Sequence, residues 1–305
     1  MTVTTPDLAQ VAQNAADLAS AAKTGVDASA FDVPSGDWPF DVHPVAGYVG
    51  AMVAGIDLRT PMTATVLERL QHALAHYGVL FFRGQHIEPE HHAAFGRQFG
   101  NLRTPAPYME VLESCPDVCV ISTENGKAYL TDQWHQDVSW PERPTRYSIL
   151  HMRAIPSHGG DTLWSSLYLA YERLSPSMQD FLTTLTVRHG QPGNVEAMHF
   201  DHPLVIRHPV TGRRSIYANP VFTQRINELT PGESQALLAH LYAHATTPEF
   251  TCRWRWQVGD VAMWDNCHVM HYALGDYHPH YRMLHRIEIE GERLLPAVPV
   301  ACPVP

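Results

Sequence analysis

The stretch Trp134-His135-Gln136-Asp137 contains the first side chains in the chain that could hold a metal ion and still leave part of it open for chemistry. Successive side chains of a β-strand alternate between its two faces, so on a strand His135 and Asp137 point the same way. On a helix the same spacing would part them. The apolar segment 146–153, with β-branched and aromatic residues, favours the strand. One imidazole and one carboxylate cannot hold a metal, so a third ligand must come from another part of the chain.

A His-x-Asp pair is a weak signal by itself. The chain has 20 His residues, and Asp makes up about one residue in twenty of an average protein, so roughly one such pair is expected by chance. The pattern gains weight only if the chain also supplies a distant His on another strand and a group that binds a cosubstrate.

The composition indicates a globular protein that acts on small molecules. A chain of 305 residues with 45% hydrophobic content can bury a sizeable core. Its 21 basic residues are scattered among 31 acidic ones, for a formal charge of -10, which argues against a nucleic-acid or membrane surface. Five Cys without framework spacing indicate reduced thiols. With no signal peptide and no apolar stretch near 18 residues, we expect a cytoplasmic protein.

The chain divides at about residue 40. We expect residues 1–40 to form an N-terminal helical extension, ending near Gly25, and a Pro- and Gly-containing linker, and residues 41–305 to form the main domain. The many short strands and few long helices after residue 130 predict a mainly β fold, a barrel or sandwich with surrounding helices. We expect helices at 64–77, 88–99, 167–174, 175–185 and 230–244, and strands at 79–82, 146–153, 251–257, 260–264 and 281–290.

The segment 103–129 carries Pro105, Pro107 and Pro116. Proline lacks a backbone N–H and is rare in central strands, so the sequence predicts an irregular segment here. Loops of this kind commonly frame a binding pocket.

The third metal ligand has two candidates in the segment 264–273, His268 and His271, and their spacing does not choose between them. Further on, Arg282 and Arg286 lie four apart on the last expected strand and so share one face with Leu284. Two buried guanidinium groups are costly unless they meet anions. Structural salt bridges and an anionic ligand explain the pair about equally well.

Taken together, these parts resemble the taurine dioxygenase and 2,4-dichlorophenoxyacetate dioxygenase family of Fe(II)/2-oxoglutarate oxygenases. Single matches would be unspecific, but they fall in the family's order and spacing and cover most of the chain after residue 77. The matching segments are 78–85, 134–137, 159–164 (Gly-Gly-Asp-Thr-Leu-Trp), 250–256, 264–266, 271–273 (His-Tyr-Ala), 276–277 and 282–286. Residues 1–40 lie outside the resemblance, which implies a double-stranded β-helix, a distorted jelly roll with helices packed outside.

The resemblance also implies a ligand set for Fe(II). His135, Asp137 and His271 match the family's two histidines and one carboxylate, and His271 is preferred because it precedes Tyr-Ala and lies eleven residues before Arg282. Three protein ligands on one face of the ion leave positions for the keto acid end of 2-oxoglutarate and for O2. Because Asp137 is present, hydroxylation of a C–H bond is favoured over halogenation, with release of succinate and CO2.

For the cosubstrate, the family's pattern points to Thr162 and Arg282. A guanidinium fork matches a carboxylate in a bidentate manner, and a Thr hydroxyl adds a directional hydrogen bond. Arg286 matches a second arginine, which in the family lies near the cosubstrate or near an anionic group of the substrate.

The expected substrate is larger and more apolar than taurine. Where the taurine enzymes carry a His that reads the sulfonate, this chain has Pro105, and Thr131 is too short to replace a second polar residue. Apolar walls are expected from Tyr108, Val138 and Phe222, and Arg286 remains available for one acidic group; Arg103 is the alternative that would substitute for the missing His.

Other outcomes share the same residues. Desaturation, epoxidation and C–N, C–O or C–S cleavage use the same kind of site, and a cupin-like metal-binding protein would need the three ligands but would not need Thr162 and Arg282. Relatives are commonly dimers or tetramers, so a homo-oligomer is expected.

Overall fold

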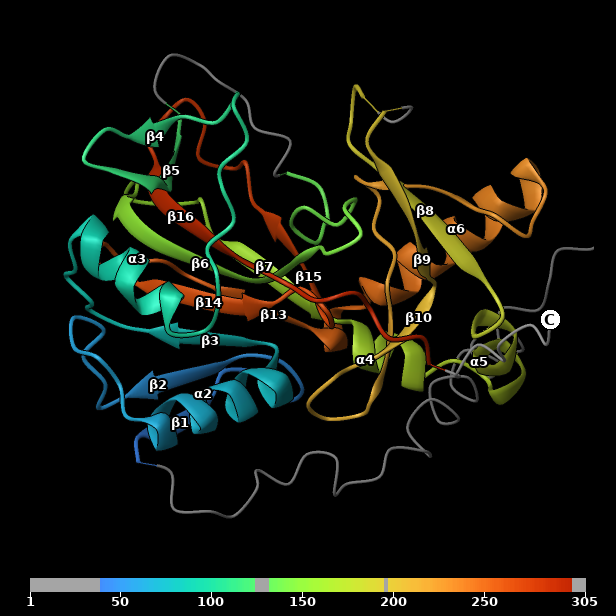
Figure 1. The fold of residues 1–305 in the computed structure, drawn as a ribbon, viewed down its shortest axis with the longest axis horizontal. Coiled ribbons are helices and arrows are strands. Elements are labelled where there is room, and N and C mark those ends of the chain that lie inside the picture. The colour runs from blue at the N-terminus through green and yellow to red at the C-terminus, as the bar shows by residue number, and fades with distance from the viewer. Residues whose placement is uncertain (1–38, 124–131, 195–196, 298–305) are drawn as a thin grey trace, which may run out of the picture.

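The computed structural model of the protein describes residues 39–123, 132–194 and 197–297. The described chain is mainly β, with helices on the outside (Figure 1). The N-terminal helix expected before Gly25 lies outside the described residues.

The largest sheet has eight strands in the order β1-β2-β3-β14-β6-β16-β5-β4. Its central strands come from distant parts of the chain, so β14 lies between β3 and β6, and β6 between β14 and β16. The four residues of β3 are buried on both faces, which explains its continuous apolar sequence. The strands are β1 (Asp41–Pro44), β2 (Ala51–Ala54), β3 (Val79–Phe82), β4 (Val111–Leu112), β5 (Cys115–Ser122), β6 (Thr145–Ala154), β14 (Val261–Asp265) and β16 (Met283–Glu290).

A second sheet of three strands, in the order β13-β7-β15, packs against this one. Its strands are β7 (Thr162–Ser166), β13 (Thr251–Trp254) and β15 (Val269–Ala273). Large aromatic side chains fill the space between the two sheets: the ring of Phe81 stacks on that of Trp254 with centroids 4.0 Å apart, and the rings of Trp164 and Trp264 lie 5.8 Å apart. The two sheets therefore share one core.

Helices and two small sheets cover the outside. The helices α2 (Ala64–Tyr77) and α3 (Pro89–Arg97) pack their apolar side chains on the outer face of the main sheet. The elements from α4 to β12, with α6, enclose a separate core and lie to the right in Figure 1. They are α4 (Leu167–Glu172), α5 (Pro176–Leu182), β8 (Thr186–Gly190), β9 (His199–Pro203), β10 (Val205–Arg207), β11 (Arg214–Ile216), β12 (Thr223–Ile226) and α6 (Pro231–Ala245), followed by the 3-10 turn η3 (Pro248–Phe250).

Most elements agree with those expected from the sequence, but the irregular segment predicted over residues 103–129 contains the short strand β4 and the longer strand β5. Residues 115–122 form β5, which pairs with β16 as its antiparallel neighbour. Pro116 is tolerated because it lies exposed near the start of a strand close to the sheet edge. The buried Val118 and Val120 supply the core side chains that the proline content concealed.

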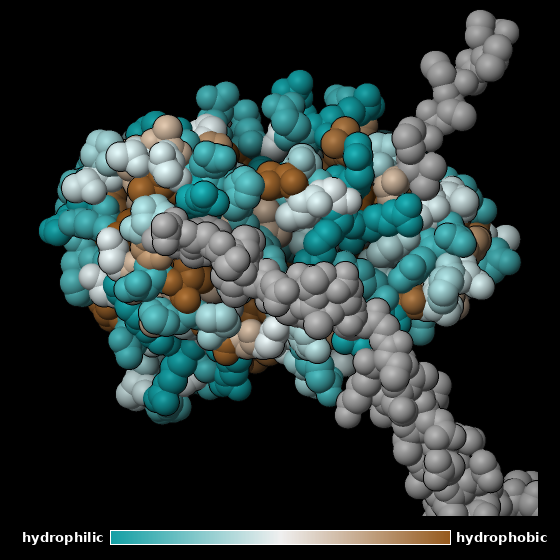
Figure 2. Space-filling view, turned by 90° about the horizontal axis from the view of Figure 1, so that it is seen from below, coloured by the Kyte–Doolittle hydropathy of each residue, from teal (hydrophilic) through white to brown (hydrophobic). Residues whose placement is uncertain are grey.

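On the face seen in Figure 2, hydrophilic side chains prevail among the described residues, and the hydrophobic ones form small separate areas. Within the described residues, no helix has the length and apolar character needed to cross a membrane.

Gly78 connects the first helix to the core. It ends α2 at a φ of 77°, and its N–H donates to the Leu74 carbonyl. A Cβ atom at this position would lie 2.4 Å from Cγ1 of Val269 on β15. The glycine is therefore required both by the backbone conformation and by the close approach of the second sheet.

We predict that Gly78→Ala lowers the free energy of unfolding by about 2–5 kcal/mol, because a left-handed conformation costs about 1–2 kcal/mol and overpacking about 1–3 kcal/mol. Gly55→Ala is the matched control, since Gly55 has a φ of 82° and nothing within 4 Å of an added Cβ. It should lose only the conformational part. Denaturant unfolding of both variants measures the difference, and equal losses would contradict the packing argument.

Candidate active site

The three predicted metal ligands meet between the two sheets. His135, Asp137 and His271 each offer a ligand atom, and these atoms all lie within 4.8 Å of one another. Nε2 of His135 is 3.7 Å from Oδ1 of Asp137, and Nε2 of His271 is 3.9 Å from Oδ2. All three side chains are buried. Metal bonds of about 2.1 Å would reach from one ion to atoms separated by these distances.

The predicted strand at His135 is reduced to one bridge. The backbones of His135 and His271 exchange two hydrogen bonds of 2.9 and 2.8 Å, which bring β15 beside the first ligand. Asp137 lies in a turn, where its N–H donates to Oδ1 of Asn266. The next residue, Val138, has a φ of 39°, a conformation that costs about 1–3 kcal/mol for a side chain of this kind. The two ligands converge because of this turn and not because of strand alternation.

Hydrogen bonds from neighbouring residues orient the ligands. Nδ1 of His135 lies 2.7 Å from the Gln133 carbonyl, which leaves the lone pair of Nε2 facing the carboxylate. The Ser148 hydroxyl donates to Oδ2 of Asp137 at 2.7 Å and is itself held by Asn266. Neither Ser148 nor Asn266 was predicted to have a role at the site. Asn266 lies within a segment that carries the family resemblance, whereas nothing in the sequence singles out Ser148.

Burial and neighbouring charges favour the protonation states that a metal requires. Burial lowers the pKa of His135, and it lowers the pKa of His271 to about 3, so both imidazoles are neutral near pH 7. Burial alone would raise the pKa of Asp137, but the groups around its carboxylate, among them the Arg286 guanidinium and the Ser148 hydroxyl, together outweigh burial and lower that pKa. Two neutral imidazoles and one carboxylate form a donor set that suits Fe(II).

His268, the other candidate for the distal ligand, belongs to a different group. Its ring stacks on Tyr168 with centroids 4.0 Å apart, and it lies with His208 and Asp265 in a second cluster of possible ligand atoms. There Nη2 of Arg146 is 2.7 Å from Oδ2 of Asp265 and 2.8 Å from Nε2 of His208. A guanidinium group already neutralises this carboxylate, so we interpret the second cluster as a structural ion pair.

Arg282 and Thr162 face the same narrow cavity as the three ligands. Arg282 is 5% exposed, its Nε donates to the Gly160 carbonyl, and within the described parts of the chain no carboxylate lies within 4.0 Å of its guanidinium. Burial lowers its pKa accordingly. Thr162 accepts a hydrogen bond of 3.0 Å from the indole of Trp256, so its own hydroxyl proton remains available to an acceptor.

Arg286 differs from Arg282 because it has acidic partners. Its Nη1 lies 3.3 Å from Oδ1 of Asp137, and its Nη2 lies 3.6 Å from Oε2 of Glu288. The salt-bridge interpretation of the arginine pair thus applies to Arg286 and not to Arg282. The cavity between these side chains holds only about 30 Å³, the volume of one water molecule.

The residues expected to contact the substrate have mixed positions. Phe222 packs beside the ligands, with its ring centroid 6.4 Å from that of His135 and 5.0 Å from that of Trp140. Val138 is half-buried in the turn after Asp137, whereas Tyr108 is 68% exposed and does not line the cavity. Thr131 lies outside the described residues. The roles of these four residues in substrate binding stay predictions.

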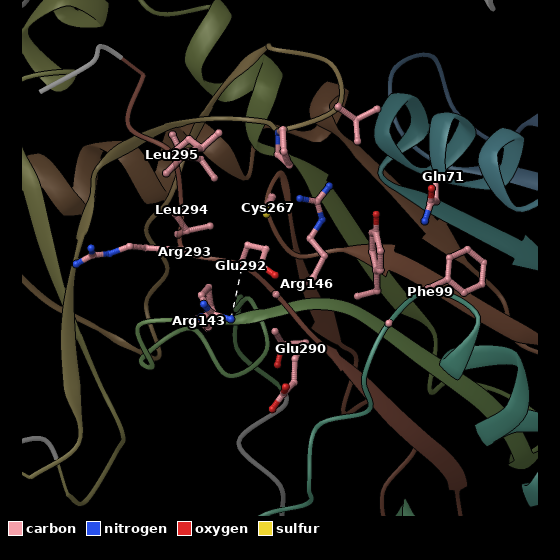
Figure 3. Close-up of a pocket in the computed structure, with 18 of the residues that line it drawn as sticks. Gln71, Phe99, Arg143, Arg146, Cys267, Glu290, Glu292, Arg293, Leu294 and Leu295 are labelled. Carbon is pink, nitrogen blue, oxygen red and sulfur yellow. Dashed lines mark ion pairs between the residues drawn. The ribbon is translucent and has the colours of Figure 1, made fainter.

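A larger cavity of about 660 Å³ lies elsewhere, and none of the described ligand or cosubstrate residues lines it (Figure 3). Its walls combine Phe99 and Leu294 with charged side chains, of which Arg143 and Glu292 pair at 3.5 Å. Because it lacks the metal-binding side chains, we do not assign the chemistry to this cavity.

Comparisons with known proteins agree with this geometry. A family model described as "Taurine catabolism dioxygenase TauD, TfdA family" matches residues 41–287. The chain belongs to this family. A sulfate ester dioxygenase of Pseudomonas putida, named as α-ketoglutarate-dependent, is 32% identical over 83% of this chain and 90% of its own length. The corresponding 2,4-dichlorophenoxyacetate dioxygenase of Cupriavidus pinatubonensis is 29% identical over 75% and 90%.

Solved structures extend the similarity to the fold. A taurine dioxygenase from Burkholderia xenovorans superposes with a TM-score of 0.76 at 36% identity, covering 83% of this chain and 91% of that one. A structure of AAD-2 with Mn(II) and N-oxalylglycine gives a TM-score of 0.73 at 25% identity, with 85% and 99% covered. The resemblance stated from sequence is confirmed, and the enzyme class is that of dioxygenases dependent on α-ketoglutarate, also called 2-oxoglutarate.

We predict that His135→Ala, Asp137→Ala and His271→Ala each abolish metal-dependent turnover and weaken Mn(II) binding at least about tenfold, because each removes one of three ligands. His268→Ala is the control: it removes a buried imidazole from the second cluster and should leave Mn(II) affinity unchanged. Calorimetric titration with Mn(II) measures both. Loss of binding in His268→Ala, with retention in His271→Ala, would show that the distal ligand is assigned wrongly.

Proposed function

We propose that the protein is an Fe(II)- and 2-oxoglutarate-dependent dioxygenase that hydroxylates a C–H bond of a small organic substrate and releases succinate and CO2. The observation that carries this proposal is the buried guanidinium of Arg282, which has no carboxylate within 4.0 Å in the described chain and faces the same cavity as the three ligands. Asp161 and Asp276 act on it only from a greater distance. An unpaired buried cation is costly unless a ligand neutralises it. The far carboxylate of 2-oxoglutarate would do so.

Each residue then has a separate task. His135, Asp137 and His271 would hold Fe(II), while Arg282 and the Thr162 hydroxyl would bind the far carboxylate. The bound iron, with 2-oxoglutarate and O2, supplies the oxidising chemistry. Ser148 and Asn266 keep the Asp137 carboxylate oriented, and the aromatic core between the sheets excludes bulk water from one side of the site.

The remaining expectations belong to the same proposal. We place the catalytic domain at residues 41–305, with residues 1–40 as an appended segment, and interpret the two facing sheets as a double-stranded β-helix. We expect a homo-oligomer, a dimer or tetramer, because relatives commonly form one. A cytoplasmic location fits the four buried free cysteines of the described chain.

The proposed substrate class rests on Pro105, which the sequence aligns with the sulfonate-reading His of the taurine enzymes, and on Phe222, which packs beside His135. Pro105 cannot donate a hydrogen bond to a sulfonate, and the ring of Phe222 beside His135 offers apolar surface. A site built to bond a small zwitterion rejects analogues through unpaired polar groups, and this chain lacks those groups. We therefore propose a substrate that is larger and more apolar than taurine.

The direct test of the proposed function is succinate formation from 2-oxoglutarate by the Fe(II)-loaded protein. We predict that Arg282→Ala raises the 2-oxoglutarate requirement on the order of 10- to 100-fold, because a charge-assisted hydrogen bond contributes about 1.5–3 kcal/mol. Thr162→Val should cost less, about 0.5–1.5 kcal/mol. Arg253→Ala is the control. Arg253 lies on β13, the strand next to β7 and Thr162, but its side chain is half-exposed and paired with Asp161. Unchanged cosubstrate affinity in Arg282→Ala would remove the main argument for 2-oxoglutarate.

We predict that taurine supports little O2 consumption beyond the uncoupled background, and that better substrates occur in a panel of larger and more apolar compounds, which includes anions (aryloxy acids, alkyl sulfates and N-acyl amino acids) and uncharged compounds. An oxygen electrode compares the panel at equal concentration, and the mass of the product identifies hydroxylation. Efficient turnover of taurine would contradict the proposed substrate class.

A further inference from the structure

The last strand places an acidic side chain behind the site. Arg282 precedes β16, and Leu284 and Arg286 follow at every second position and line the cavity with it. Glu288 is the next residue in this alternation and lies behind the cavity wall. Ile287 and Ile289 point to the opposite face, into the core under α3.

The strand register supports the same placement. Glu288 lies directly opposite Ser148 on β6, and Ser148 is the residue whose hydroxyl donates to Asp137. Side chains directly opposite each other in an antiparallel pair have Cβ atoms about 4.5–5.5 Å apart on the same face. Glu288 is therefore a neighbour of the metal-binding carboxylate.

The contacts of Glu288 are incomplete. The residue is 7% exposed, its Oε2 lies 3.6 Å from Nη2 of Arg286, and its Oε1 has no hydrogen-bond partner among the described residues. On the other side of this pair, Nε of Arg286 also lacks a partner there. Oε1 of Glu288 is therefore an unused hydrogen-bond acceptor beside the guanidinium of Arg286. Leaving a buried carboxylate oxygen without a donor lowers the stability of the fold.

The charges of the two arginines are consequently different. When a metal ion binds Asp137, Arg286 retains Glu288 as its acidic partner, whereas Arg282 has none among the described residues. The Arg286–Glu288 pair is close to neutral, and an anion that approached Arg286 would also meet the carboxylate beside it. In a weakly polar interior this repulsion is substantial.

We propose that Glu288 is a specificity-determining residue that neutralises Arg286, so that the site binds an uncharged substrate whose polar end donates a hydrogen bond, and disfavours anionic substrates. The inference rests on the proposed function and narrows its substrate class. It differs from the chemistry suggested by the name of the sulfate ester relative, because sulfate esters are anions. Of the two kinds of substrate left open by Arg286, one acidic group or none, it selects the second.

The test compares two ligands that share an alkyl chain, hexyl sulfate and 1-hexanol, by calorimetric titration of protein loaded with Mn(II) and 2-oxoglutarate. In Glu288→Gln, hexyl sulfate should bind about tenfold or more tightly than in the parent protein, while 1-hexanol should change by less than about threefold. Glu290→Gln is the matched control. It removes the same charge two residues further along β16, from an exposed residue that lines the cavity of Figure 3. It should leave both affinities unchanged.

A second substitution tests the route of the effect. If the gain arises from Arg286, it should disappear in the double variant Glu288→Gln/Arg286→Gln. Glu288→Met, which keeps the length of the side chain without its charge, should reproduce the gain and guards against misfolding of the first variant.

The proposal is overturned if hexyl sulfate binds equally well, or fails to bind, in folded Glu288→Gln and Glu288→Met, or if Glu290→Gln gives the same gain. Binding of 2-oxoglutarate to the Mn(II)-loaded parent protein is measured first. Its absence would contradict the proposed function, and the hexyl sulfate comparison on the metal-free protein would still report on the Arg286–Glu288 pair.

Discussion

Two backbone hydrogen bonds between His135 and His271 hold together the parts of the chain on which the site depends. They join His135, which belongs to no regular strand, to β15 at the edge of the second sheet. Because these hydrogen bonds connect the backbones, they place the two imidazoles side by side, with ring centroids 4.1 Å apart, independently of a metal ion. Asp137 lies in the turn that follows His135, where its N–H donates to Oδ1 of Asn266 and its carboxylate accepts a hydrogen bond from Ser148. A ligand set prepared in this way loses little conformational entropy when an ion binds.

Around this bridge, buried charges are divided into a compensated and an uncompensated part. Asp137, Arg286 and Glu288 form a connected chain of opposite charges, whereas Arg282 lies at the other end of the cavity without an acidic partner in the described chain. A buried charge without a partner lowers the free energy of unfolding. Such a charge is retained where a ligand neutralises it. This division fits the proposal that Arg282 binds the carboxylate of the cosubstrate and that the end at Arg286 receives a substrate of nearly neutral charge.

Local signals predicted much of this fold. Gly78 ends α2, Ser175 caps α5, and the Thr230–Glu233 capping box begins α6, because these roles depend on residues close in sequence. The strand β5 was missed because prolines concealed a partner that only β16 supplies. The choice between His271 and His268 was open because it depends on the register of β15, which no local pattern fixes. The family resemblance supplied that choice.

Within the site, the sequence indicated the functional groups better than their surroundings. Alternation along the last strand placed Arg282 and Arg286 on one face, and the same rule extends to Glu288, which was overlooked. The role of Ser148 could not be predicted from the sequence, since it arises from a hydrogen bond to Asp137, which lies in a turn 11 residues earlier in the chain. The turn at Asp137 could not be predicted from strand alternation either, because the Asp137 N–H is held by Asn266, 129 residues further along the chain.

The most direct test of this account is a crystal structure of the protein with Mn(II) and 2-oxoglutarate, with anomalous scattering used to locate the metal. The account predicts an anomalous peak between His135, Asp137 and His271, and the far carboxylate of the cosubstrate on Arg282 and Thr162. A metal ion in the cluster of His208, Asp265 and His268, or a cosubstrate carboxylate held by Arg286 with Arg282 left unpaired, would contradict it.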